Sequence, residues 1–318
     1  MSFSFARAPL APTFLPAPDA KRQIIDALAD FSIEVTPAGA AKQPTLGALL
    51  PRVTRVYVAF VPGEDHRSVV ATARQIRAEG LTPVPHVPAR SIPDRATLEV
   101  YLRQLTDEAG VEEVLVIGGG LDQPVGAFSG SLALLETGLL EAYGIRAIGL
   151  AGHPEGQRML PAPGAATTLE QKLGYAARTS AEIHLVTQFL FEAEPLLAWE
   201  RALRGHGSTL PIHVGVPGPA TVKTLLRYAR MCGVGNSMRM LTRQAGSLFK
   251  LASVSAPDAL LTDLADHRAS DPASRIERLH FYPFGGIARL AGWLAAIQAG
   301  EFTLNDDGRG FTVHGAWD

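Results

Sequence analysis

Short apolar runs recur along the chain, and each is followed by a stretch with helical periodicity. Eight of these runs are rich in β-branched or aromatic residues and are expected to form strands. They are Phe31–Pro37, Arg55–Val61, Thr82–Ala89, Glu113–Gly119, Arg146–His153, Ile183–Phe189, Pro211–Gly218 and Arg278–Gly285. Several are apolar almost throughout, which is typical of parallel strands that are covered on both faces.

The segments between these runs carry apolar residues at a spacing of three to four, which predicts helices. Asp65–Glu79 is one example, and Ser91–Ala109 is another that opens with a motif typical of a capped helix start. Alternating strands and helices predict parallel βαβ units, and eight of them predict a single-domain (β/α)8 TIM barrel of the α/β class. A doubly wound open sheet is the alternative. Residues 219–270 are expected to hold two or three helices before the last strand.

Composition agrees with one large domain, because 47% of the 318 residues are apolar and 19% are charged. Residues 1–18 are rich in Pro and Ala and are predicted to be an extended arm, which leaves residues 19–318 for the barrel. A net charge of −2 does not suggest a nucleic-acid partner. Cys232 is the single cysteine, so no intrachain disulfide can form. No apolar run approaches the ~20 residues that span a bilayer, so we expect a cytoplasmic protein without a membrane anchor.

In a barrel of this type the chemistry lies at the carboxyl ends of the strands. Glu34 lies there between Ile33 and Val35, where burial would raise the pKa of the carboxyl and suit a general acid. An ion pair with Lys42 is the alternative role. Gln188 ends the sixth run, and its amide can bind a pterin edge or a nicotinamide carboxamide, or else satisfy nearby backbone groups.

Three further strand ends carry candidate cofactor contacts. Gly118, Gly119 and Gly120 stand at the end of the fourth run, where glycine permits close approach of a ligand or a tight turn. His86 and His153 end two other runs. Two histidines with a glutamate could bind a metal, but they come from separate strands without a local ligand spacing, so no metal site is predicted. Neutral imidazoles in contact with a cofactor are favoured instead.

The motifs together resemble those of the methylenetetrahydrofolate reductase family. VTQFLFE at 186–192 is similar to the family signature T-Q-F-x-F-[DE], and it is the most distinctive match. FSIEVTP, PVPHV, AGHPEG, HVGVPGP and LHFYPFG also resemble family motifs and occur in the family's order, over roughly residues 25–300. The resemblance implies a barrel enzyme that reduces 5,10-methylenetetrahydrofolate to 5-methyltetrahydrofolate, with NADH or NADPH as hydride donor and FAD as carrier.

Family roles can be transferred to the matching positions. Glu34 would be the acid that opens the five-membered ring of the folate, and Gln188 would contact folate and nicotinamide. Residues at the flavin would be His86, Gly118, Gly119, His153 and Gln157. Residues at the substrate would be Phe189, Tyr282 and Phe284. Because family members associate, a homo-oligomer is also expected; the apolar segment Leu290–Ile297 could serve an interface, although packing on the barrel is favoured.

Several flavin contacts of the family are missing from this chain. Gly118, Gly119 and Gly120 stand where the family has R-G-D, Ala59 stands where it has a threonine, and Gly286 replaces an arginine. The flavin-binding lysine has no certain match, because Lys172 lies too far upstream without an insertion. Two further hypotheses follow. Hydride could pass directly from nicotinamide to a folate-bound one-carbon unit, or the chain could be a folate-binding protein without catalysis.

Overall fold

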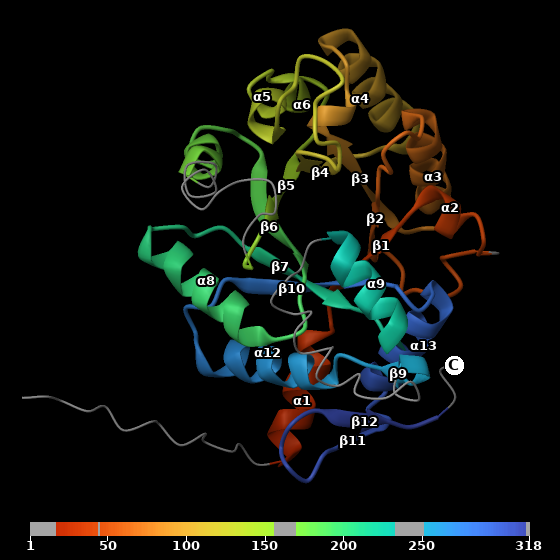
Figure 1. The fold of residues 1–318 in the computed structure, drawn as a ribbon, viewed down its shortest axis with the longest axis vertical. Coiled ribbons are helices and arrows are strands. Elements are labelled where there is room, and N and C mark those ends of the chain that lie inside the picture. The colour runs from red at the N-terminus through yellow and green to blue at the C-terminus, as the bar shows by residue number, and fades with distance from the viewer. Residues whose placement is uncertain (1–16, 44, 156–169, 233–250, 316–318) are drawn as a thin grey trace, which may run out of the picture.

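The computed structural model describes residues 17–43, 45–155, 170–232 and 251–315. Within these ranges eight parallel strands close into a barrel (Figure 1). In spatial order they are β1 (Phe31–Val35), β2 (Arg55–Val58), β3 (Thr82–Pro88), β4 (Glu113–Ile117), β5 (Ala147–Gly152), β6 (Glu182–Phe189), β7 (Ile212–Pro217) and β10 (Ile276–Tyr282), which pairs again with β1.

This architecture confirms the predicted (β/α)8 TIM barrel. Each predicted run overlaps one barrel strand, and β6 and β10 begin one and two residues before their runs. The strands end up to three residues before the apolar runs do, because the runs continue into the turns at the barrel mouth. After β1, for example, the Thr36 hydroxyl accepts a hydrogen bond from Gly39 N and caps the short helix α2 (Pro37–Ala40).

Helices surround the barrel on its outside (Figure 1). They are α3 (His66–Ala78), η1 (Ala89–Ser91), α4 (Arg95–Ala109), α5 (Ser131–Leu135), α6 (Leu139–Ala142), α8 (Ala193–Gly205), α9 (Val222–Cys232), α12 (Asp258–Ser270) and α13 (Ile287–Gln298). Helix α4 begins four residues after Ser91, because Asp94 is its cap and accepts a hydrogen bond from Thr97 N. Between β7 and β10 lie α9 and α12, as expected for that enlarged connection, with a small antiparallel pair, β8 (Ala220–Thr221) and β9 (Val254–Ser255).

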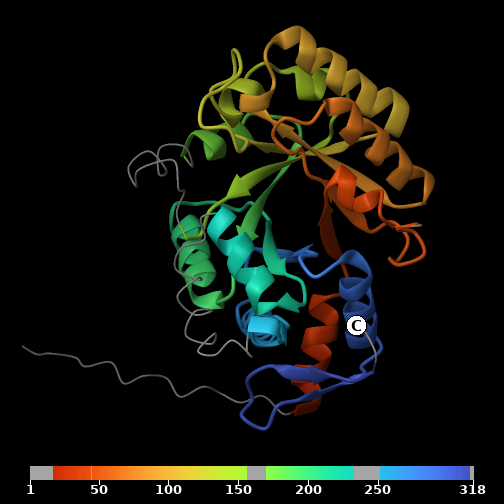
Figure 2. The same cartoon turned by 45° about the vertical axis from the view of Figure 1, so that its right-hand side comes forward.

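An additional helix, α1 (Ala17–Ala27), precedes the barrel and packs against α12 and α13 (Figure 2). It begins at Ala17, two residues inside the predicted arm; residues 1–16 lie outside the described part of the chain. Beside α1 lies the C-terminal hairpin of β11 (Phe302–Leu304) and β12 (Phe311–Val313). The Lys21 ammonium donates to the Phe302 carbonyl at 2.8 Å and so ties α1 to this hairpin.

The predicted packing role of Leu290–Ile297 is confirmed. These residues lie in α13, whose Leu290, Trp293, Leu294 and Ile297 are buried against the barrel. Trp293 also packs its ring on Phe281 of β10, at a centroid distance of 6.5 Å. Among the described residues, no helix has the length and apolar character that crossing a bilayer requires.

Alternate strand residues belong to two different cores. The outward residues, such as Ile33, Val214 and Phe281, join the helices in the main apolar core. The inward residues fill the barrel lumen, where a small apolar cluster of Tyr57, Val84, Leu115 and Val186 is accompanied by buried histidines, Arg278 and Glu113. Polar groups therefore occupy positions that are filled by branched aliphatic residues in many barrels.

Candidate active site at the carboxyl end of the barrel

The lower part of the lumen is a largely buried network that we call the polar floor, although Arg55 and Asp30 are 34% and 62% exposed at its lower edge. It consists of Asp30, Arg55, Tyr57, Glu113, His184, His213 and Arg278. The Arg55 Nε donates to Glu113 Oε2 at 2.8 Å, and Arg278 Nη1 lies 3.1 Å from His213 Nε2. The Tyr57 hydroxyl lies 3.2 Å from His184 Nε2 and 3.4 Å from His213 Nδ1. Arg278 also pairs with Asp30 at the amino end of the barrel.

The two histidines of the polar floor are neutral. Burial lowers the pKa of His213 to about 2, with the Arg278 charge acting in the same direction. Burial also lowers the pKa of His184 well below its ordinary value, assisted by His213 and Arg278. Their rings stack at a centroid distance of 4.2 Å, which is compatible with two uncharged imidazoles.

Glu34 lies above the polar floor, at the carboxyl end of β1, and its side chain is 20% exposed. Its Oε2 is 3.3 Å from His86 Nε2 and 3.7 Å from His280 Nε2. The other ring nitrogen of His280 bonds to the Ser32 hydroxyl at 2.9 Å. The partners of Glu34 are thus two histidines from β3 and β10 and not Lys42, because parallel strands bring their inward residues together across the lumen.

The predicted pKa shift of Glu34 is wrong in direction. Burial alone raises the pKa of this carboxyl, but the charge of His86 and the close contacts of the carboxylate with His86 and His280 outweigh burial and lower the pKa to about 2. Glu34 is therefore ionised at neutral pH. The sequence gives the apolar setting of this residue but not its two partners, which come from distant strands.

An aromatic wall, made of Phe189, Phe191, Tyr228, Tyr282 and Phe284, stands beside Glu34. Tyr282 lies 5.0 Å from the His280 ring and 5.7 Å from Phe284, and Phe284 stacks on Tyr228 at 4.1 Å. The Phe189 ring is only 1% exposed and supports Tyr282 and Phe284 from below. Tyr282, Phe284 and Tyr228 are only partly buried, so they can present ring faces to a flat ligand.

A β-bulge in β6 puts Phe189 into this wall. Val186 pairs with His213 and Phe189 with Gly215, so β6 has one more residue than β7 over this stretch. Gly215 permits the arrangement, because a Cβ there would lie 2.6 Å from the Thr187 carbonyl oxygen. Simple alternation along β6 would have turned Phe189 outward.

Gln188 lies within this bulge and is partly buried. Its Oε1 accepts a hydrogen bond from Phe189 N at 3.2 Å. Among the described residues no hydrogen bond joins Gln188 to Glu34. The role of Gln188 at folate and nicotinamide stays a prediction.

The residues that the family resemblance places at a flavin lie on two neighbouring parts of the mouth. His153 follows β5, and burial, with the charge of Lys172, lowers its pKa to about 4, so its imidazole is neutral. Lys172 reaches the same place and donates to the Ala151 carbonyl at 2.8 Å, while burial lowers its pKa to about 8. The spacing of the sequence could not predict that Lys172 lies beside His153. Gln157 lies outside the described residues.

The glycine loop after β4 is packed by other parts of this chain. The Arg90 guanidinium donates to the Gly119 carbonyl, and a Cβ on Gly118 would lie 3.5 Å from it. A Cβ on Gly119 would lie 3.1 Å from Pro88, and one on Gly120 would lie 3.2 Å from Pro62. Gly119 has φ +90°, so the loop is also a tight turn that favours glycine.

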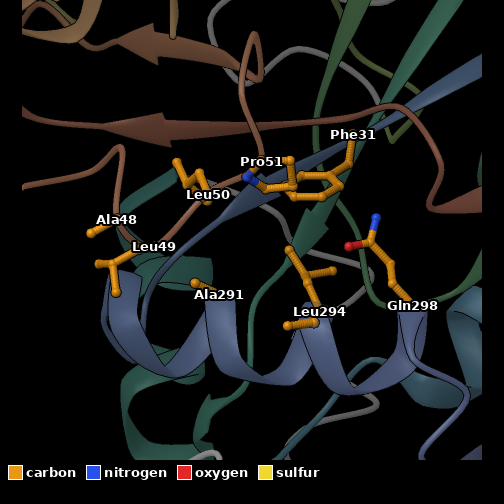
Figure 3. Close-up of a pocket in the computed structure, with 9 residues that line it drawn as sticks. Phe31, Ala48, Leu49, Leu50, Pro51, Ala291, Leu294 and Gln298 are labelled. Atoms are coloured by element: carbon orange, nitrogen blue, oxygen red, sulfur yellow. The ribbon is translucent and has the colours of Figure 1, made fainter. Parts of the chain in front are cut away.

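A pocket of another kind lies at the opposite end of the barrel, between α13 and the loop before β2 (Figure 3). Most of its lining residues are apolar, such as Phe31, Leu49, Leu50 and Leu294, and Gln298 adds a polar group. It contains none of the candidate residues, and the chemistry of this fold is expected at the other end. Within the described ranges no cluster of three or more His, Cys, Asp or Glu side chains could hold a metal ion.

No protein-family model matches the sequence. Among solved structures, the fold is similar to an uncharacterized protein from Clostridium thermocellum that binds two copies of 5-methyl-5,6,7,8-tetrahydrofolic acid. That match has a TM-score of 0.55 and 10% identity, and covers 88% of this chain and 97% of the other. A conserved protein from Enterococcus faecalis matches with a TM-score of 0.47 and 12% identity over 85% of this chain and 66% of its own. The carboxyl transferase domain of Rhizobium etli pyruvate carboxylase gives 0.45 and 8%, over 85% and 42%. At 10% identity, the match to the Clostridium thermocellum protein shows the barrel fold alone.

Proposed function

We propose that this chain binds a reduced folate at the carboxyl end of the barrel and reduces its one-carbon unit, with NADH or NADPH as the hydride donor. The observation that carries the proposal is the Glu34 carboxylate, held by His86 and His280 beside the aromatic wall. A pteridine is flat and can stack on the partly exposed rings of Tyr282 and Phe284. The order of the family-like motifs supports the same ligand class, as does the folate bound by the Clostridium thermocellum protein.

The proposed reaction converts 5,10-methylenetetrahydrofolate to 5-methyltetrahydrofolate. One carbon–nitrogen bond of the five-membered ring breaks, and the released nitrogen takes a proton that Glu34 delivers. The resulting iminium carbon accepts a hydride from the reduced nicotinamide, which is thereby oxidised. The chain's own task is to orient the two reactants and to move one proton.

The residues at the glycine loop do not fit a flavin. Arg90 and Pro88 pack against Gly118 and Gly119, along which the family would place the flavin. His86 is directed at Glu34. The sequence also lacks the family's R-G-D at this loop. We therefore propose that hydride passes directly from nicotinamide to the folate, which is the second of the sequence-based hypotheses.

Deuterium tracing tests this proposal. The purified chain is incubated with 5,10-methylenetetrahydrofolate and a nicotinamide cofactor deuterated at its transferable position, and the product is analysed by mass spectrometry. Direct transfer leaves the deuterium in the methyl group. A flavin route would let the label exchange with solvent at the flavin. A yellow cofactor that co-purifies with the chain would also support the flavin route.

A matched pair of variants tests the site. Glu34→Gln keeps the shape of the side chain but removes the charge and the proton route, so turnover should fall by about 10²–10⁴-fold. The control Glu99→Gln alters an ion pair with Arg95 on the outside of α4 and should leave turnover unchanged. Calorimetry with 5-methyltetrahydrofolate measures binding separately. A chain that binds no reduced folate would contradict the proposed function altogether.

A further inference from the structure

The proton that the reaction consumes needs a source, because Glu34 is ionised in the resting site. Two imidazole nitrogens face its Oε2, and both are buried without a hydrogen-bond partner among the described residues. They are His86 Nε2 and His280 Nε2, at 3.3 and 3.7 Å. One carboxylate oxygen thus has two candidate proton donors.

The two histidines differ in their surroundings. His280 is fully buried, its Nδ1 is engaged by the Ser32 hydroxyl at 2.9 Å, and its ring lies 4.5 Å from Tyr57. Burial lowers the pKa of His280, although Glu34 opposes the shift, so this imidazole is neutral at neutral pH. His86 lies closer to Glu34 and ends the inward face of β3 near the mouth.

We propose that His86 supplies the proton that Glu34 passes to the folate nitrogen, so that the two side chains act as a relay. This inference rests on the proposed function and names the donor within the same site. A proton moves from His86 Nε2 to Glu34 Oε2, and from Glu34 to the nitrogen as its bond to carbon breaks. The neutral His86 then regains a proton from solvent, and the hydride remains the source of both electrons.

Other titratable groups face His86, and none of them replaces it. From β2, the Tyr57 ring lies 6.5 Å away, and from α4 the Tyr101 hydroxyl donates to the His86 carbonyl at 2.9 Å. Burial raises the pKa of both phenols, so they stay protonated over the working range. From β10 comes the neutral His280, and from β1 comes Glu34 itself. His86, whose Nε2 lies 3.3 Å from Glu34 Oε2, is therefore the proton donor that the geometry of the site favours.

The test compares pH–rate profiles of wild type, His86→Asn and His280→Asn. Wild type should lose kcat as the pH rises through one titration. His86→Asn should lower kcat by about 10²-fold or more, abolish that alkaline limb, and regain at least about tenfold with added imidazole at a pH where imidazole is protonated. His280→Asn should keep the alkaline limb and gain nothing from imidazole, because its neutral ring supplies no proton.

Folding and binding are measured on the same samples. Circular dichroism and 5-methyltetrahydrofolate calorimetry should show that His86→Asn is folded and binds folate like wild type. A folded, folate-binding His86→Asn that keeps the alkaline limb, or that imidazole does not rescue, overturns the relay but leaves the proposed function standing. A wild-type chain that reduces no folate overturns the proposed function itself, before any variant is compared.

Discussion

The polar floor should make the protein unusually sensitive to acid. His184 and His213 are neutral in the folded lumen but titrate near pH 6.5 in an unfolded chain. Below that pH the unfolded chain binds more protons than the folded one, so the free energy of unfolding falls as the pH falls. Each such imidazole contributes about 1.4 kcal/mol per pH unit, and the two together about 3 kcal/mol per unit.

The size of this effect can be compared with the stability of an ordinary domain, about 5–15 kcal/mol. About two to five pH units below the ordinary histidine pKa are then enough to unfold the barrel. Glu34 adds to the loss below its unfolded pKa of 4.5, because its folded pKa is about 2 and the unfolded carboxyl again takes up the proton first. Both effects have the same sign, so acid unfolding should be steep.

Urea unfolding at a series of pH values from about 7.5 to about 4.5, followed by circular dichroism, measures this dependence. His213→Gln removes one titrating group and should reduce the slope by about 1.4 kcal/mol per pH unit, even though the variant is less stable at neutral pH. A free energy of unfolding that stays constant between about pH 6.5 and pH 5 would show that the floor imidazoles take up protons in the folded state, and would refute the reasoning.

Three substitutions test the packing and the aromatic wall. Gly215→Ala should destabilise the fold by about 1–3 kcal/mol, measured by urea unfolding, because the new Cβ meets the Thr187 carbonyl oxygen at 2.6 Å; equal stability would mean that the bulge can shift freely. Trp293→Ala should cost about 3–5 kcal/mol in the same assay, since the side chain is fully buried. Phe284→Ala should weaken binding of 5-methyltetrahydrofolate about 2- to 10-fold in calorimetry by removing a stacking face, with the fold intact; unchanged affinity would place the pteridine elsewhere.

The barrel could be predicted from the sequence because its signal is local. A strand over Thr82–Ala89 can be predicted from these residues alone. Strand β3 indeed covers all of them except Ala89. The same is true of α3, which lies within the predicted Asp65–Glu79 and begins after the Asp65 cap. Strand ends were less accurate, because apolar turn residues prolong the runs.

The site was predictable only in part, because its chemistry depends on contacts between distant strands. Glu34 could be predicted from its place in an apolar strand. The direction of its pKa shift, however, depends on His86 and His280, which lie at least 52 positions away in the printed sequence. The inward turn of Phe189 depends on a bulge that alternation does not reveal. Lys172 reaches the mouth through a segment whose course the spacing could not give.

The inward face of β10 has a consequence for the behaviour of the whole molecule. Its alternate residues Arg278, His280 and Tyr282 belong in turn to the polar floor, to the Glu34 site and to the aromatic wall. One continuous backbone segment therefore links the stability of the lumen to the geometry of the mouth. Changes that loosen the bottom of the barrel should be felt as altered ligand affinity at the top, so a folding defect and a functional defect in this region will tend to arise together.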